Sequence, residues 1–213
     1  MSAARHDTSA AVHFSDLLER GLRVWSQRQT DDGVLSLALP LQGLDPLLQL
    51  ADLEAPDPFR FLWDGAPGLS LAAAGRCHHL DLCGSRRFEL AQRFSDITLG
   101  RILDGSPEAP AQARSRILLA FSFFEQTGEQ QTRGGIPSVQ AVLPRWQLSR
   151  HGRQGWLRVH GMAHQDSDVR TLVESLWLMA ERLQSWRTLP RHATGTVSGR
   201  ITAGDWEKRY TSA

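Results

Sequence analysis

Lysine is almost absent from this sequence: Lys208 is the only one, so the other basic side chains are all arginine. The 24 basic and 23 acidic residues nearly cancel, giving a net charge of +1 without a long run of one sign. Such a balance gives no support to a nucleic-acid-binding surface. The only cysteines, Cys77 and Cys83, are too few for a disulfide framework.

Long apolar runs are also missing. The N-terminus, MSAARHDTSAAVHF, has polar residues where a signal peptide requires a continuous apolar segment. The longest mostly apolar stretch, ILLAFSFF at 117–124, is far shorter than a membrane span. We therefore expect a cytoplasmic protein that binds neither membranes nor nucleic acid.

What the sequence does contain is typical of a globular protein. Hydrophobic residues make up 41% of the 213 positions, charged residues 22%, and seven tryptophans are spread along the chain. A chain of this length can form one ordinary domain or two small ones, and it can bury a sizeable core.

Periodicity and turn residues predict the elements. Helical spacing of apolar residues predicts helices over 12–28, 44–54, 85–103 and 168–186. Short apolar runs closed by turn residues predict strands over 34–41, 59–63, 69–75, 77–83, 116–124, 138–152 and 154–162. Consecutive strands favour antiparallel pairing. The predicted fold class is therefore α/β of the α+β type: a mostly antiparallel sheet with flanking helices.

Several details of these elements are open to a structural test. We expect Pro40 to end the first strand, Ser85 to cap the helix over 85–103, and 105–113 to be a surface loop. His151-Gly152 should form the turn of a β-hairpin. The expected buried faces are Phe88, Ala91, Phe94, Ile97 and Ile102 in the third helix, and Val169, Leu172, Val173, Leu176, Ala180 and Leu183 in the last.

The segment CHHLDLC at 77–83 is the first candidate metal site. In a strand, Cys77, His79, Asp81 and Cys83 share one face because side chains alternate. They extend along about 20 Å, so one ion reaches only two neighbours, such as His79 and Asp81. We predict that the segment binds no metal and packs one face against the following helix.

Other patterns point to no catalytic site. His160, His164 and Asp166 lie where a strand gives way to a helix, and a loop with Asp168 as the helix cap accounts for them. Gly134-Gly135 predicts a turn between strands, and the sequence has neither a phosphate-binding loop nor a nucleophile elbow. We predict no catalytic, substrate-binding or metal-binding residue in this chain.

Three short motifs stand close together in the sequence: FLWD at 61–64, LAAAG at 71–75 and GSRRF at 84–88. They resemble the N-terminal region of isochorismate synthases, members of the chorismate-binding enzyme family. ILLAFSFFEQ and PSVQAVLPRWQLSR, at 117–126 and 137–150, resemble two later strands of the family. One departure is Leu119-Ala120, where the family usually has a glycine pair or Gly-Phe. The resemblance covers nearly the whole chain from residue 12.

The resemblance implies one half of a fold with two large sheets packed face to face. It also implies Mg²⁺-dependent conversion of chorismate to isochorismate, in which a lysine activates water, a glutamate acts as general acid and further glutamates hold the metal. Those residues belong to the family's C-terminal portion. AGDWEKRYTSA at 203–213 resembles the helix that precedes the lysine strand, and Lys208 lies inside that helix without matching the catalytic lysine.

We therefore expect 1–190 to be an N-terminal scaffold part, and 191–213 a linker and the start of the catalytic portion, truncated. Mg²⁺ is implied for the complete enzyme and not for this chain alone, whose expected partner is a complementary C-terminal fragment. The alternative is a self-sufficient binding or assembly module that reuses the framework. The reading frame that follows the gene distinguishes the two. Whether the pathway ends in menaquinone, phylloquinone, a siderophore or salicylate stays open.

Overall fold

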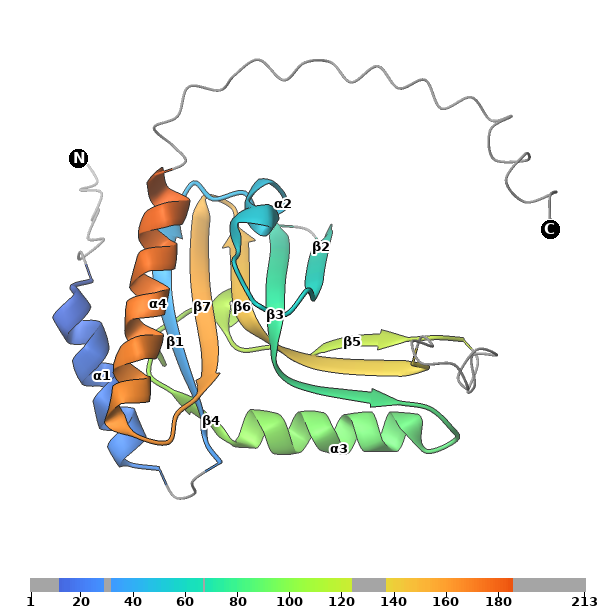
Figure 1. Ribbon diagram of the computed structural model, residues 1–213. Helices are drawn as coiled ribbons and strands as arrows, with labels where there is room; N and C mark the ends of the chain where they lie inside the picture. The colour runs from blue at the N-terminus through green and yellow to red at the C-terminus, as the bar shows by residue number, and fades with distance from the viewer. Residues whose placement is uncertain (1–11, 29–31, 67, 124–136, 186–213) are drawn as a thin grey trace, which may run out of the picture.

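The computed structural model describes residues 12–28, 32–66, 68–123 and 137–185 (Figure 1). Its helices are α1 (Phe14–Ser26), α2 (Pro46–Gln49), α3 (Arg87–Gly100) and α4 (Asp166–Ser185), with short 3-10 turns at Leu50–Asp52 and Ala111–Ala113. Its strands are β1 (Val34–Gln42), β2 (Arg60–Ala66), β3 (Leu69–Leu82), β4 (Ile102–Asp104), β5 (Leu118–Phe121), β6 (Val139–His151) and β7 (Gln154–Met162).

The described strands form one sheet in the order β2-β3-β6-β7-β1-β4, and β5 pairs with the first part of β6. Every pairing is antiparallel except that of β1 with β4. The predicted fold class, a mostly antiparallel sheet with flanking helices, is confirmed. β6 and β7 are joined by the expected turn, where Gly152 has a φ of 59°.

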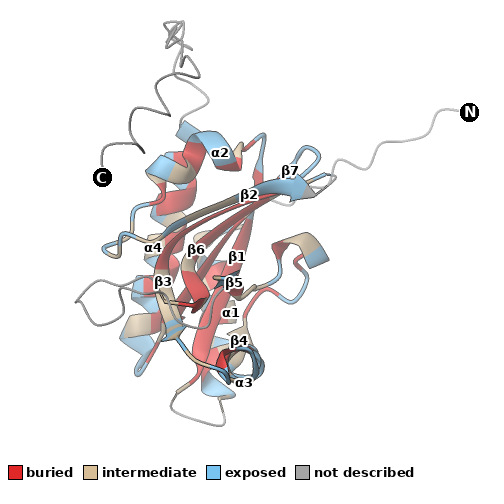
Figure 2. Cartoon of the chain, turned by 90° about the vertical axis from the view of Figure 1, so that its right-hand side faces the viewer, coloured by how far each residue is buried: buried red, intermediate tan, exposed pale blue. Residues whose placement is uncertain are grey.

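The core lies between the sheet and the helices α1 and α4, which run side by side against β1 and β7 (Figure 1). Buried residues follow the central strands of the sheet (Figure 2). All six residues predicted for the inner face of the last helix are buried, and Met179 joins them. Asp168 lies in the first turn of that helix, and its carboxylate accepts hydrogen bonds from the backbone N–H groups of His164 and Gln165. No helix in the described ranges is long and apolar enough to span a membrane.

The segments 69–75 and 77–83, predicted as two strands, are one continuous strand, β3. The prediction was wrong because Gly75, which suggested a strand end, instead takes a φ of 66° within the strand. The register of β3 against β6 shifts between Arg76 and His78, so a β-bulge replaces the expected turn. Figure 1 shows β3 and β6 bending together, with α3 running beneath their far halves.

Pro40 was expected to end the first strand, but β1 continues to Gln42. Proline is tolerated there because β4 pairs only with residues 34–36, which leaves the edge of β1 at Pro40 without a strand partner in the described part of the chain. The segment 105–113 is a loop as predicted. It is not simply on the surface, since Ser106 and Ala113 are fully buried against the sheet.

Two predictions for α3 were wrong. Ser85 does not cap the helix: it lies in a turn after Gly84, and α3 begins at Arg87 without a side-chain cap. Ala91 is buried as predicted, but the rest of the buried face is rotated, because Ser95 and Thr98 lie beside it nearest the sheet. Phe88 and Ile97 are consequently 52% and 42% exposed, and Ile102 belongs to β4.

Candidate functional site

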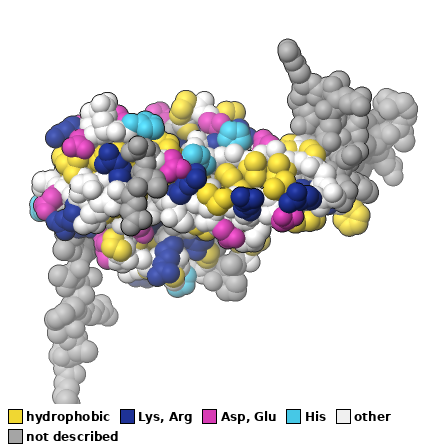
Figure 3. All heavy atoms as spheres, turned by 90° about the horizontal axis from the view of Figure 1, so that it is seen from below, with side chains coloured by type: hydrophobic (Ala, Val, Ile, Leu, Met, Phe, Trp, Pro, Cys, Tyr) yellow, Lys and Arg dark blue, Asp and Glu magenta, His cyan; other side chains and the backbone are white. Residues whose placement is uncertain are grey.

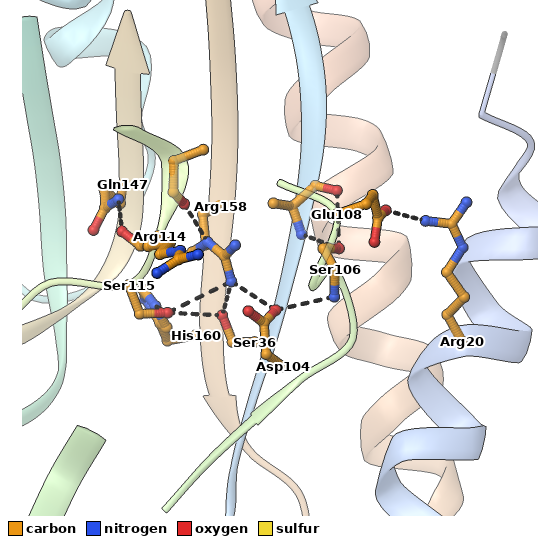
Figure 4. Close-up of polar contacts among 12 residues, drawn as sticks. Arg20, Ser36, Asp104, Ser106, Glu108, Arg114, Ser115, Gln147, Arg158 and His160 are labelled. Atoms are coloured by element: carbon orange, nitrogen blue, oxygen red, sulfur yellow. Dashed lines mark hydrogen bonds and ion pairs between the residues drawn. The ribbon is translucent and has the colours of Figure 1, made fainter. Parts of the chain in front are cut away.

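A set of connected polar side chains lies on the sheet, beside the loop over 105–117 (Figure 4). Its centre is Arg158 of β7, which is 1% exposed. β-strand alternation places Arg158 and His160 on the face opposite Leu157 and Val159, which belong to the apolar core. The same alternation in β1 turns Ser36 toward this polar face.

The Arg158 guanidinium is held on several sides. Its Nε donates to the carbonyl of Ala113 at 2.6 Å, and its Nη1 donates to Ser36 Oγ at 2.6 Å and to Asp104 Oδ1 at 3.0 Å. The charge of the buried arginine is therefore balanced by one carboxylate, as burial of a charge requires. Nη2 has no partner among the described residues.

His160 is fully buried beside this arginine. Its Nδ1 lies 2.8 Å from the carbonyl oxygen of Pro144, which can only accept, so Nδ1 carries the proton and donates it. Nε2 then accepts from Ser115 Oγ at 2.9 Å. Burial, assisted by the positive charge of Arg158, lowers the pKa of His160 to about 3. The imidazole is therefore neutral near pH 7, with both nitrogens engaged.

The contacts of the cluster attach the loop to the sheet. Gln147 of β6 donates to the carbonyl of Arg114 at 2.9 Å. Ser106 Oγ accepts from the backbone N–H of Ala38 and donates to the carbonyl of the same residue, at 2.9 and 3.2 Å. An ion pair between Arg20 and Glu108 joins the loop to α1. The cluster is built to position this loop, and its imidazole is not free to exchange a proton with a substrate.

Sequence reasoning missed this cluster because its members are far apart along the chain. Ser36, Asp104, Ser115, Arg158 and His160 come from two long strands, a short strand and a loop. The available signal was a polar residue alternating with aliphatic ones in the runs LSLAL and LRVHG. A shallow pocket beside the cluster is lined by Pro110, Gln112, Ser149, His151, Gln154 and Trp156, and it holds no carboxylate.

The structure does not bring the candidate metal ligands of the segment 77–83 together. His79 and Asp81 are exposed on β3, whereas Cys77 lies at the bulge and Cys83 lies beyond the end of the strand. Burial raises the pKa of the Cys77 thiol to about 11, so it stays protonated. As expected, the other side of this segment faces α3.

The second candidate group is separated as well. His160 is buried in the cluster, whereas His164 and Asp166 are exposed at the start of α4. Gly134-Gly135, Trp206, Lys208 and Tyr210 lie outside the described residues. Within the described ranges, no three His, Cys, Asp or Glu side chains are placed to hold a metal ion. The resemblance places the ligands of Mg²⁺ in the family's C-terminal portion, so these ranges do not test that expectation.

Comparison with known proteins identifies the family. The family model described as "Chorismate binding enzyme" matches residues 18–213. The chain belongs to the chorismate-binding enzyme family. A search of curated proteins returns no match. Among solved structures, this family member is similar to MenF, the menaquinone-specific isochorismate synthase from Escherichia coli, with 20% identity and a TM-score of 0.43.

That similarity covers 83% of this chorismate-binding family member and 35% of the MenF chain. The chain thus spans about a third of the length of the enzyme it matches. The assignment to the family rests on the sequence match, which extends over most of the chain.

Proposed function

We propose that this chain is the N-terminal scaffold part of an isochorismate synthase and that it converts no chorismate on its own. The observation that carries the proposal is a contrast. The chain belongs to a family named for binding chorismate, yet no three His, Cys, Asp or Glu side chains of the described residues are placed to hold a metal ion.

The chemistry explains why this contrast matters. Moving the hydroxyl group of chorismate requires a base to activate water and an acid to protonate the leaving hydroxyl, both within hydrogen-bonding reach of the substrate. His160 is neutral and fully bonded inside the protein. Arg158 is paired with Asp104. Surface arginines attract the chorismate dianion, but this attraction lowers the barrier of the reaction only where it is stronger in the transition state than in the bound substrate.

The isochorismate branch of the family is favoured by three motifs. FLWD lies in β2, LAAAG lies in β3 immediately before the bulge, and GSRRF spans the turn that begins α3. These motifs therefore form one contiguous β2-β3-α3 unit at one edge of the sheet, where β3 pairs with β6. That placement supports a role in holding the framework.

The test is a coupled assay that follows isochorismate formation by the purified chain with chorismate and Mg²⁺. We expect no turnover above the uncatalysed rate. A Lys208→Ala variant is the matched control, because Lys208 is the only lysine in the chain. Turnover that this substitution abolishes would show that Lys208 is the catalytic lysine and that the proposal is wrong.

A further inference from the structure

A small pocket near the turn between β6 and β7, here called the hairpin pocket, has no role in the proposed function. That turn lies at the opposite end of the sheet from α3 (Figure 1). The volume of the pocket is about 260 Å³, slightly below the range of ordinary ligand sites. A ligand of this pocket must therefore be small. The residues that line it are Pro110, Gln112, Ser149, His151, Gln154 and Trp156.

The pairing of β6 with β7 provides the floor of the hairpin pocket. In this pairing Ser149 lies opposite Trp156, and His151 lies opposite Gln154. Because side chains alternate along a strand, all four are on the sheet face that carries Arg158, away from the core beneath α1 and α4. Two neighbouring pairs of the ladder therefore place four side chains beside one another.

The wall of the pocket is the 3-10 turn at Ala111–Ala113, whose backbone is fixed to the sheet (Figure 4). Arg158 donates to the carbonyl of Ala113. Gln147 donates to the carbonyl of the next residue, Arg114. The wall is therefore in place before a ligand binds, which lowers the entropic cost of binding.

The polar side chains of the hairpin pocket are free to bond a ligand. Within the described part of the chain, no hydrogen bond is made by the side chains of Gln112, Ser149, His151 and Gln154. Amide, hydroxyl and imidazole groups can together both donate and accept hydrogen bonds. The neighbouring polar cluster differs, since its buried arginine and histidine are bonded on several sides.

The pocket also lacks formal charge of either sign, since neither a carboxylate nor an arginine or lysine lines it. The other end of the molecule is different: charged side chains lie around the apolar ones that gather over α3 (Figure 3). A site without an opposite charge does not offset the cost of removing water from a charged ligand. The hairpin pocket therefore favours a neutral ligand, and chorismate, with two carboxylates, does not match it.

Trp156 adds an apolar surface to these polar groups. It is half-buried, packs against Ala38, Ala109 and Ala113, and lines the pocket. A cyclic polyol matches both features, because its hydroxyl groups donate and accept around the ring while its C–H groups can face an aromatic side chain. We infer that the hairpin pocket binds a small neutral cyclic polyol, such as a monosaccharide.

The first test titrates the isotope-labelled 213-residue chain with D-glucose and follows the side-chain amide and indole signals by NMR. A few hydrogen bonds of modest net strength predict a Kd in the millimolar range. The signals of Gln112, Gln154 and Trp156 should shift together. The signal of Gln27, exposed at the end of α1, should not shift. No shift at tens of millimolar D-glucose, or shifts that include Gln27, would contradict the inference.

The second test compares variants. Gln154→Ala removes an exposed amide and should raise the Kd for D-glucose about fivefold, whereas the matched control Gln27→Ala should leave it unchanged. Trp156→Leu, which keeps an apolar side chain against the loop, should raise the Kd about tenfold. An unchanged Kd in both Gln154→Ala and Trp156→Leu would place the binding elsewhere and overturn the inference.

A third measurement tests the class of ligand. D-glucuronate has the same ring as D-glucose with a carboxylate added, so it should bind the parent chain more weakly. Acetamide, a neutral molecule with one amide and no ring, should shift the same signals only at higher concentrations. Tighter binding of D-glucuronate or of acetamide than of D-glucose would show that the pocket does not select a neutral polyol.

Discussion

At position 160, a histidine is held neutral in the interior of the protein. Two features cause this: burial removes the imidazole from water, and the adjacent Arg158 opposes a second positive charge. The tautomer is fixed by Pro144, whose carbonyl accepts the Nδ1 proton. A polar residue in such a place is a structural element of the fold, and its titration affects stability rather than catalysis.

The stability of the protein should therefore depend on this histidine at acidic pH. The pKa of His160 is about 3 in the folded protein and about 6.5 in the unfolded chain, so the unfolded chain binds more protons between these values. The free energy of unfolding should fall as the pH decreases through that window, by up to about 1.4 kcal/mol per pH unit from this group.

Denaturant unfolding between pH 7 and pH 4 measures this effect. A His160→Gln variant should lose stability less steeply with falling pH than the parent chain. Equal slopes for the parent and His160→Gln would mean that His160 titrates normally in the folded protein.

Among the elements, β3 carries a bulge that interrupts its register with β6. Its bulge lies next to Gly75, whose φ of 66° is in the left-handed region that favours glycine. The position is also crowded: a Cβ there would lie 2.6 Å from the Cβ of Ala55 and 3.2 Å from that of Arg145. Backbone conformation and packing both require glycine at this position.

Gly75→Ala should therefore be more destabilising than a change that introduces only backbone strain. Gly152 provides the control, since its φ is 59° and a Cβ there meets nothing within 4 Å. We expect Gly152→Ala to cost about 1 kcal/mol and Gly75→Ala about 3 kcal/mol, because overpacking adds to strain. Urea unfolding of both variants tests this, and equal losses would show that the contact with Ala55 relaxes.

The sequence predicted elements whose apolar period is long and regular. α4 illustrates this, since Val169, Leu172 and Leu176 face the core at the expected spacing. For α3 only Ala91 was predicted on the correct face, because tertiary packing places the small Ser95 and Thr98, rather than Phe88 and Ile97, near the sheet. The polar cluster could not be found from local pattern, since Ser36 and Arg158 meet only through the pairing of β1 with β7.

For the whole molecule, the described part has a continuous apolar core that joins α1 and α4 to the sheet. The polar cluster around Arg158 is buried and holds the loop over 105–117 against the sheet. The family match covers 18–213. The proposed framework role requires that the reacting groups come from other residues of a complete enzyme.

The most direct test of that account is complementation. The 213-residue chain is co-expressed with a C-terminal portion of an isochorismate synthase that is inactive alone, and isochorismate formation from chorismate is measured with Mg²⁺. A positive control pairs that portion with the N-terminal part of its own enzyme. The account predicts turnover only when this chain and the C-terminal portion are both present. Turnover by this chain alone, or a positive control that works while this chain restores nothing, would contradict it.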